Sequence, residues 1–453
     1  MRGIKSSYVF RLTSYSTIMT NKIQNGITSY ISHLKLFSKN ARLFLLGAFF
    51  VGLAFAGFQL LFNLYMKELS YKESAIGQIL SMNAWGAVII TLPVAYILQK
   101  FQIRKVLIFS TLLASMFYFL QATILELKGL LWVSLILGMS VASYRVAAAP
   151  FFMKNSTPQE RTYLFSMNFG IMMLAAMVGS LGGGYLVSLF NNILKNQVWA
   201  YRGSLYVAVF LGLLGVIPFY LIKPEKSENE KGESLIWEFK LLKERGGLLL
   251  KLCVPFFIVG LGAGLIIPFL NLYFRDRFLL PAKSIGVYYA LLQFFMLAGI
   301  ILGPVLSKKV GMIKSVVWTQ LASIPFMVCL AFTNFLPLAV MAFLLRGALM
   351  NMNQPITTNF SMEKVSEKEQ PLTNSLTALA WTLSWGISAN LGGKLIQAYG
   401  YTLPLLIATG LYILSSILYY YFFSSQEDRE LGKEKLFIPE VSAQKVPSDF
   451  KYE

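Results

Sequence analysis

Two arginines lie deep inside long apolar stretches of the sequence, where a charged side chain is costly. Arg145 lies within an apolar block at about 130–152, and Arg346 lies within a block at about 336–358. An ionised side chain at the centre of a membrane costs about 3 kcal/mol or more, so each arginine is a candidate functional group. A guanidinium binds carboxylate or phosphate through paired hydrogen bonds, which predicts binding of a substrate anion. The alternative interpretation is that each arginine hydrogen-bonds backbone carbonyl groups where helices meet.

Amide and indole side chains accompany the arginines in the apolar blocks. Gly52, Ala56, Gln59 and Asn63 are spaced so that they share one face of a helix. Amides inside apolar spans often hold helices together, but as a set they also predict a binding surface. The candidate substrate-binding residues are Arg145, Arg346, Gln59, Asn63, Asn168, Asn271, Asn353, Gln354 and Trp381.

The elements that must position these residues are membrane-spanning helices. The chain is 56% hydrophobic and only 13% charged over 453 residues, which is too few charges for a soluble protein of this length. Its apolar residues form blocks of about 20, the length that crosses a hydrocarbon core about 30 Å thick. We predict an all-α membrane protein with twelve spans at about 43–65, 75–98, 105–126, 130–152, 163–190, 201–222, 250–273, 284–306, 315–333, 336–358, 372–397 and 402–423.

The two halves of the chain resemble each other at an offset of about 209 residues. Phe62-Asn63-Leu64-Tyr65 recurs as Leu270-Asn271-Leu272-Tyr273, and Gly183-Gly184-Tyr185-Leu186 recurs as Gly392-Gly393-Lys394-Leu395. Such a repeat indicates internal duplication, and six spans per half give both halves the same orientation. The predicted organisation is an N-terminal segment (1–40), a six-helix bundle (41–222), a central loop (223–249), a second bundle (250–423) and a tail (424–453).

The distribution of charge gives the expected orientation. The formal net charge is +19, and most of the 40 Lys and Arg residues fall on one predicted side of the membrane. This asymmetry is typical of cytoplasmic loops and argues against a nucleic-acid partner. We therefore expect a multi-pass protein of the cell membrane with both termini and the central loop in the cytoplasm. The first 40 residues contain no apolar stretch like that of a signal peptide, and Met19 is an alternative start.

Cofactor and metal chemistry finds no support in the sequence. Cys253 and Cys329 lie inside predicted spans, and we interpret them as small packing residues. The one histidine, His33, precedes the first span. We expect no metal and no cofactor, and we expect a monomer whose partners are the lipid bilayer and a small-molecule substrate.

The pattern of six plus six helices around a charged central loop resembles the major facilitator superfamily over residues 41–423. That family carries a signature G-x-L-A-D-R-x-G-R-R between its second and third helices, and Ala95–Lys105 matches it in spacing and basic residues, with Gln99 in place of the Asp. The resemblance implies that helices 1, 4, 7 and 10 line a central cavity. It also implies a gating role for the loop residues Gln99, Lys100, Arg104, Lys105, Lys308 and Lys309, although these basic residues are equally explained as ordinary anchors at the membrane surface.

A glycine-rich run lies in the fifth predicted span. Gly179-Ser180-Leu181-Gly182-Gly183-Gly184 is similar to the G-P-x-x-G-G run of drug antiporters in this superfamily, with Ser180 in place of the Pro. Glycines at this density also let helices approach closely in lipid. The predicted helix-packing glycines are Gly179, Gly182, Gly183, Gly392 and Gly393.

The functional expectation is a secondary transporter that works by alternating access. Our first hypothesis is export of small organic, drug-like amphipathic compounds, and the alternative is transport of an organic anion held by Arg145 and Arg346. No Asp or Glu lies within the spans, so the usual titratable groups of proton-driven transport are missing there; the nearest, Glu68 and Asp276, lie at span ends. An intramembrane enzyme or sensor is a remote alternative, because the spans lack clustered acids and histidines and the chain carries no large soluble domain. We therefore expect a protein that is not an enzyme.

Overall fold

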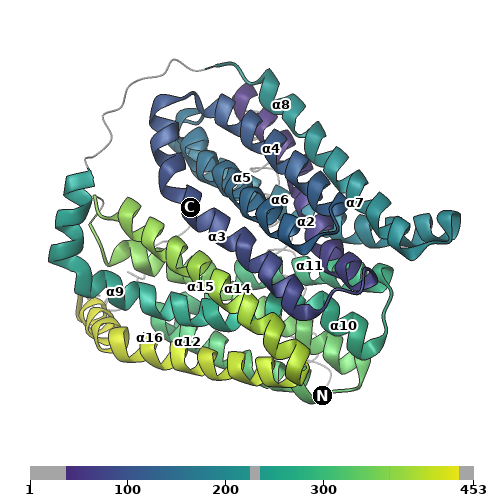
Figure 1. The fold of residues 1–453 in the computed structure, drawn as a ribbon. Helices are drawn as coiled ribbons and strands as arrows, with labels where there is room; N and C mark the ends of the chain where they lie inside the picture. Colours follow the sequence, from purple (N-terminus) through teal and green to yellow (C-terminus); the bar gives the residue numbers. More distant parts are fainter. Residues whose placement is uncertain (1–36, 225–234, 367, 438–453) are drawn as a thin grey trace, which may run out of the picture. The chain divides into compact units, whose positions relative to one another are not determined.

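The computed structural model describes residues 37–224, 235–366 and 368–437, and the regular elements in these ranges are helices. Eleven helical segments among the described residues are long and apolar enough to cross a membrane. The remaining predicted span, the eleventh at 372–397, corresponds to α15, a helix of 30 residues that buries polar side chains such as Thr373, Thr377 and Ser384. The all-α fold predicted from the apolar blocks is confirmed (Figure 1).

Nine of the predicted spans correspond to single helices, and three are interrupted. The single helices are α2 (Lys39–Glu68), α3 (Glu73–Lys100), α4 (Ile103–Thr123), α5 (Leu127–Lys154), α6 (Pro158–Leu194), α11 (Ala282–Val310), α14 (Leu336–Glu363), α15 (Gln370–Tyr399) and α16 (Thr402–Phe437). The interrupted spans are α7 (Gln197–Leu214) with α8 (Val216–Leu221), α9 (Leu235–Ile266) with η1 (Ile267–Phe269) and α10 (Leu270–Phe278), and α12 (Met312–Ala322) with α13 (Ile324–Phe332).

Proline and glycine lie at the three interruptions. Pro268 lies in η1, Pro325 is the second residue of α13, and Gly215 joins α7 to α8. Proline lacks the backbone N–H that a continuous helix requires, so the helix is interrupted or kinked there. Two helices also extend beyond the predicted spans. α9 begins at Leu235, inside the predicted central loop, and α16 continues to Phe437, inside the predicted tail.

The outward faces of the helices carry large apolar side chains. Leu92, Phe109, Trp132 and Ile301 are all more than half exposed. An apolar surface of this extent is unfavourable in water and is the surface that lipid requires. The chain is therefore a multi-pass membrane protein.

The described residues divide into two compact units that exchange half-helices. The first unit contains α2, α4 to α8 and the segment Ala282–Ala290 at the start of α11. The second contains the segment Ser70–Trp85, which includes the start of α3, together with α9, α10 and α12 to α16. This division differs from a cut at the central loop, because each half of the sequence contributes the beginning of its second helix to the other unit.

Duplicated glycines explain this exchange. A side-chain carbon placed at Gly184 of α6 would lie 2.6 Å from the carbonyl oxygen of Ala282, and one placed at Gly393 of α15 would lie 3.0 Å from Cα of Gly77. Only glycine permits such close approach of two backbones. Gly183 and Gly392 occupy the preceding positions and contact the first helix of their own unit, Gly183 against Leu61 and Gly392 against Leu265.

The remaining predicted packing glycines behave differently from each other. A side-chain carbon at Gly179 would lie 2.6 Å from the carbonyl oxygen of Leu53, so Gly179 also packs tightly against α2. Gly182 differs from the prediction, because no described atom lies within 4 Å of its side-chain position.

A buried tyrosine performs the same task in each unit. The hydroxyl of Tyr65 donates a hydrogen bond to the carbonyl of Ala122 at 3.0 Å, and the hydroxyl of Tyr273 donates to the carbonyl of Leu330 at 2.9 Å. The two partners are 57 residues apart in both cases. The accepting carbonyls lie in the last turns of α4 and α13, where the helix itself supplies no partner. The two halves that resemble each other in sequence therefore also share this tyrosine–carbonyl hydrogen bond.

Removal of either tyrosine hydroxyl should destabilise its unit by about 1–3 kcal/mol, the usual cost of leaving a buried polar group without a partner. Tyr65→Phe should cost more than Tyr273→Phe, because Arg277 also donates to the carbonyl of Leu330, at 3.4 Å. Thermal unfolding of the purified protein measures both, with Tyr421→Phe as control since Tyr421 is 79% exposed. A greater loss for Tyr273→Phe than for Tyr65→Phe would contradict this account.

Candidate functional site

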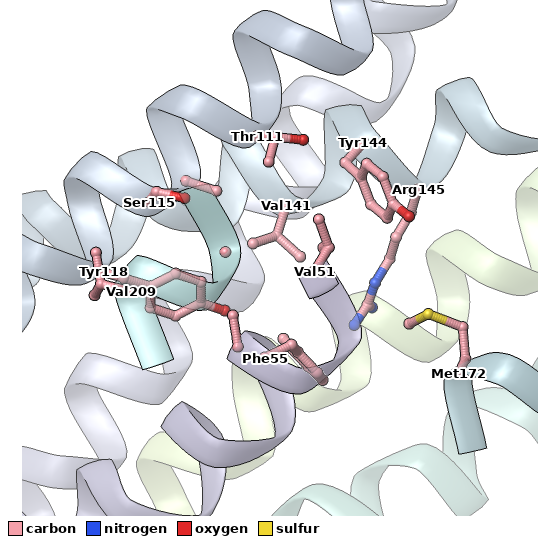
Figure 2. A pocket seen from close by; sticks show the side chains of 13 residues that line it. Val51, Phe55, Thr111, Ser115, Tyr118, Val141, Tyr144, Arg145, Met172 and Val209 are labelled. Atoms are coloured by element: carbon pink, nitrogen blue, oxygen red, sulfur yellow. The ribbon is translucent and has the colours of Figure 1, made fainter. Parts of the chain in front are cut away.

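A cavity of about 90 Å³ lies inside the first unit, between α2, α4, α5, α6 and α7. Its wall is almost entirely apolar. Val51 and Phe55 come from α2, Val141 from α5, Met172 from α6 and Val209 from α7. Figure 2 shows these side chains directed toward a common space. The cavity therefore offers a largely apolar surface to which five helices contribute.

Arg145 is the one charged residue that lines this cavity. It lies nine residues before Lys154, the last residue of α5, and so about 14 Å from that end of the helix. Its guanidinium carbon lies 5.2 Å from the centre of the Phe55 ring. Figure 2 shows the side chain extending from α5 and ending between Phe55 and Met172. The charge thus lies deep within a span and beside an aromatic ring.

Among the described residues, the guanidinium of Arg145 has no partner of opposite charge. Across residues 37–224, 235–366 and 368–437, no hydrogen bond or salt bridge to Arg145 is found, and its side chain is exposed. An arginine that only holds helices together would be buried and bonded to carbonyl groups. A cation–π contact contributes about 0.5–2 kcal/mol and leaves the five N–H donors available. Arg145 can therefore bind an anion without first breaking an ion pair.

Four polar side chains join Arg145 around the cavity. Thr111, Ser115 and Tyr118 come from α4, and Tyr144 precedes Arg145 on α5 (Figure 2). Thr111 is only 3% exposed, and its Oγ1 has no hydrogen-bond partner among the described residues. None of these residues is among the candidates predicted from the sequence. Their spacing was a usable signal, because Thr111, Ser115 and Tyr118 fall on one face of a helix.

Arg346 has a different environment from Arg145. It is 5% exposed, and its Nη2 donates a 2.6 Å hydrogen bond to the hydroxyl of Tyr412 on α16. Its guanidinium carbon lies 5.7 Å from the centre of the Tyr412 ring. Its Nε is buried without a hydrogen-bond partner in the described part of the chain. Arg346 is thus packed between helices of the second unit.

The other predicted binding residues divide into buried and exposed groups. Asn63, Asn271 and Asn353 are buried; Asn271 accepts a hydrogen bond from the backbone N–H of Leu272 at 2.9 Å, and Asn353 accepts one from Thr319. Asn168 is partly buried, with an Oδ1 that has no partner in the described ranges. The exposed residues are Gln59, Gln354 and Trp381. Of the nine candidates, Arg145 alone lines the cavity.

The predicted gating residues have local partners or none in the described structure. Arg104 donates a 2.6 Å hydrogen bond to the carbonyl of Tyr220, and Lys100 lies 4.5 Å from the centre of the Tyr96 ring. Lys105, Lys308 and Lys309 are exposed. The side chain of Gln99 lies outside the described residues. Arg104 therefore contacts the end of α8 in its own unit.

Asp276, near the end of α10, belongs to a small polar cluster. Asp276 lies 3.0 Å from Nη1 of Arg275 and accepts a 2.7 Å hydrogen bond from the hydroxyl of Tyr401. Burial and the neighbouring Asp276 carboxylate raise the pKa of Tyr401 well above its ordinary value. Asp276 is therefore held in an ion pair, as expected of a residue that connects helix ends.

Comparison with solved structures identifies the same fold elsewhere. A mutant of the nucleoside transporter NupG superposes with a TM-score of 0.70 at 14% identity, over 85% of this chain and 100% of that chain. A bacterial homolog of the human lysosomal transporter Spinster, in an inward-facing and unoccupied conformation, gives 0.69 at 14% identity over 85% and 97%. At this identity the likeness concerns the fold. A search of curated proteins gives no match.

The sequence itself matches a family model over most of its folded length. The match covers residues 44–389 and so includes the first ten predicted spans and most of the eleventh, in both halves of the chain. The structure adds the helical architecture, the duplicated tyrosine and glycine contacts and the apolar outer surface. The chain belongs to the Major Facilitator Superfamily and is a membrane transporter.

Proposed function

We propose that this transporter carries small amphipathic organic anions and that Arg145 binds the anionic group. The observation that carries the proposal is the guanidinium of Arg145, which lies deep in a span without a described ion-pair partner. Retaining such a charge is costly unless a ligand or water satisfies it. An anion is the ligand that a guanidinium binds most strongly.

The apolar wall supports the amphipathic part of the proposal. Phe55, Val141 and Met172 provide a surface that excludes water from one side of the guanidinium. Exclusion of water strengthens the attraction between the guanidinium and a bound anion, because the local dielectric constant falls. A ligand with an anionic group and an apolar group satisfies both features.

The contacts of the two arginines favour the anion hypothesis in a modified form. Arg346 already donates a hydrogen bond to the hydroxyl of Tyr412, so we assign the anion to Arg145 alone. Export of small organic, drug-like amphipathic compounds, our first hypothesis from the sequence, uses the same apolar wall but does not require a charge at Arg145. We retain secondary transport by alternating access, with both termini in the cytoplasm as the basic flanks of the spans suggest.

Equilibrium binding of butanoate and of its neutral analogue butanamide tests the proposal. At pH 7.5 Arg145→Ala should weaken butanoate binding about 30-fold, since hydrogen bonds to charged groups contribute about 2 kcal/mol. Binding of butanamide should change little, and Arg145→Lys should retain part of the affinity for butanoate because it keeps the charge. Equal loss of both ligands in Arg145→Ala would show that Arg145 supports the site without binding the anion.

A further inference from the structure

We propose that the cavity beside Arg145 is a subsite for a short aliphatic tail that ends in a hydrogen-bonding oxygen. The inference rests on the proposed anion binding at Arg145 and extends it to the other end of the ligand. The predicted ligand class is a short-chain carboxylate that carries a hydroxyl or carbonyl group on its chain.

The size of the cavity limits the tail. A water molecule occupies about 30 Å³ in the liquid, and an apolar cavity of about 150 Å³ takes up benzene. The cavity beside Arg145 measures about 90 Å³. It therefore suits a chain of about three or four heavy atoms, and an aromatic ring is too large for it.

The wall of the cavity determines the chemistry of the chain. Val51, Val141 and Val209 present branched apolar side chains, and Phe55 presents a ring. Apolar surfaces like these favour methylene and methyl groups over water. The middle of the tail is therefore aliphatic.

Thr111 indicates the polar end of the tail. Its side chain lines the cavity, it is 3% exposed, and its Oγ1 lacks a hydrogen-bond partner in the described residues. A threonine inside a helix usually donates to the carbonyl four residues earlier, as Thr91 does to Ala87 at 2.6 Å. A buried hydroxyl without a partner is unfavourable. Because Oγ1 is itself buried, an oxygen on the ligand would satisfy it after the threonine side chain rotates about its Cα–Cβ bond.

Three matched acids test the proposal: butanoate, 3-hydroxybutanoate and 4-hydroxybutanoate, with naphthalene-2-carboxylate as an oversized ligand. Equilibrium binding to the purified full-length protein at pH 7.5 should show one hydroxybutanoate binding about tenfold more tightly than butanoate. Naphthalene-2-carboxylate should bind at least tenfold more weakly than butanoate, because its rings do not enter the cavity. Thr111→Val keeps the shape of the side chain and should remove the preference for the hydroxyl group. It should also leave thermal stability unchanged or raised, since it removes an unpartnered polar group.

A second variant addresses the volume of the cavity. Val141→Phe fills the space and should weaken binding of all three butanoates about tenfold or more, whereas Val146→Phe, on the same helix but outside the cavity wall, should not. Equal affinity for butanoate and both hydroxybutanoates would overturn the subsite, as would equal binding by Val141→Phe and wild type, tight binding of the naphthalene acid, or no binding of any of the four acids.

The failure of this inference can be told apart from the failure of the proposed function. If Arg145→Ala discriminates butanoate from butanamide as predicted but the Thr111 and Val141 variants bind as wild type does, anion binding stands and the subsite is wrong. If the Thr111 and Val141 variants behave as predicted but Arg145→Ala loses butanoate and butanamide equally, the cavity binds tails and the assignment of Arg145 is wrong.

Discussion

Replacement of Gly86 by alanine should destabilise the folded protein by more than about 3 kcal/mol, a large effect for the addition of one methyl group. The new carbon would overlap sterically with the carbonyl oxygen of Leu135 and would lie 3.0 Å from the backbone nitrogen of Met139. Both groups belong to the backbone of α5, so no side-chain rotation relieves the clash. α3 and α5 must separate, and the packing along their contact is lost with them. The midpoint of thermal unfolding in detergent measures the effect.

Gly410 provides the matched control for this prediction. It lies in α16, and no described atom is within 4 Å of the position that a side-chain carbon would occupy. Gly410→Ala should therefore leave the midpoint unchanged or raise it, because alanine favours a helix over glycine by about 0.5–1 kcal/mol. Similar midpoints for the Gly86 and Gly410 variants would show that α3 and α5 are not in close backbone contact.

Removal of the hydroxyl of Tyr412 should destabilise the second unit by about 3 kcal/mol, since it leaves a buried guanidinium without its partner. The bond from Arg346 to Tyr412 is the one hydrogen bond of that guanidinium found in the described residues, and Nε has none. Thermal unfolding of Tyr412→Phe measures the loss. Arg346→Met in the same protein should recover most of it, because replacement of a buried charge by an apolar side chain of similar volume is often neutral or stabilising.

The same variants test whether Arg346 binds substrate. Arg346→Met alone should leave the affinity for butanoate within about threefold of wild type, since its guanidinium is directed to Tyr412. A loss of tenfold or more would assign Arg346 to the anion site and would restore the two-arginine hypothesis.

The spans and the repeat follow from the sequence, because both depend on patterns that a bilayer imposes directly. Blocks of about 20 apolar residues must cross it, and Tyr65 and Tyr273 keep equivalent positions and make equivalent bonds. The helical start of α9 is harder to predict. Leu235 to Arg245 is rich in leucine, lysine and glutamate, which are good helix formers, yet their charge is also typical of a solvated loop.

The candidate site could be predicted only in part. The cost of a buried charge identifies both Arg145 and Arg346, but the position along a span does not show what each guanidinium meets. Tyr412 is 66 residues from Arg346 in the chain, and the two meet only because α14 and α16 pack in one unit. The cavity beside Arg145 also could not be predicted from the sequence, because it depends on how closely five helices pack around it.

The exchange of half-helices has a consequence for split forms of this transporter. Severing the chain in the central loop would give two fragments, each of which lacks a piece that completes its own unit. The N-terminal fragment would lack Ala282–Ala290, so Gly184 would face lipid or another protein in place of Ala282. The C-terminal fragment would lack Ser70–Trp85, and with it the Gly77 that lies against Gly393. We therefore expect folding of either fragment to depend on co-expression of the other, because the duplicated halves are equivalent in architecture but each is completed by a segment of the other.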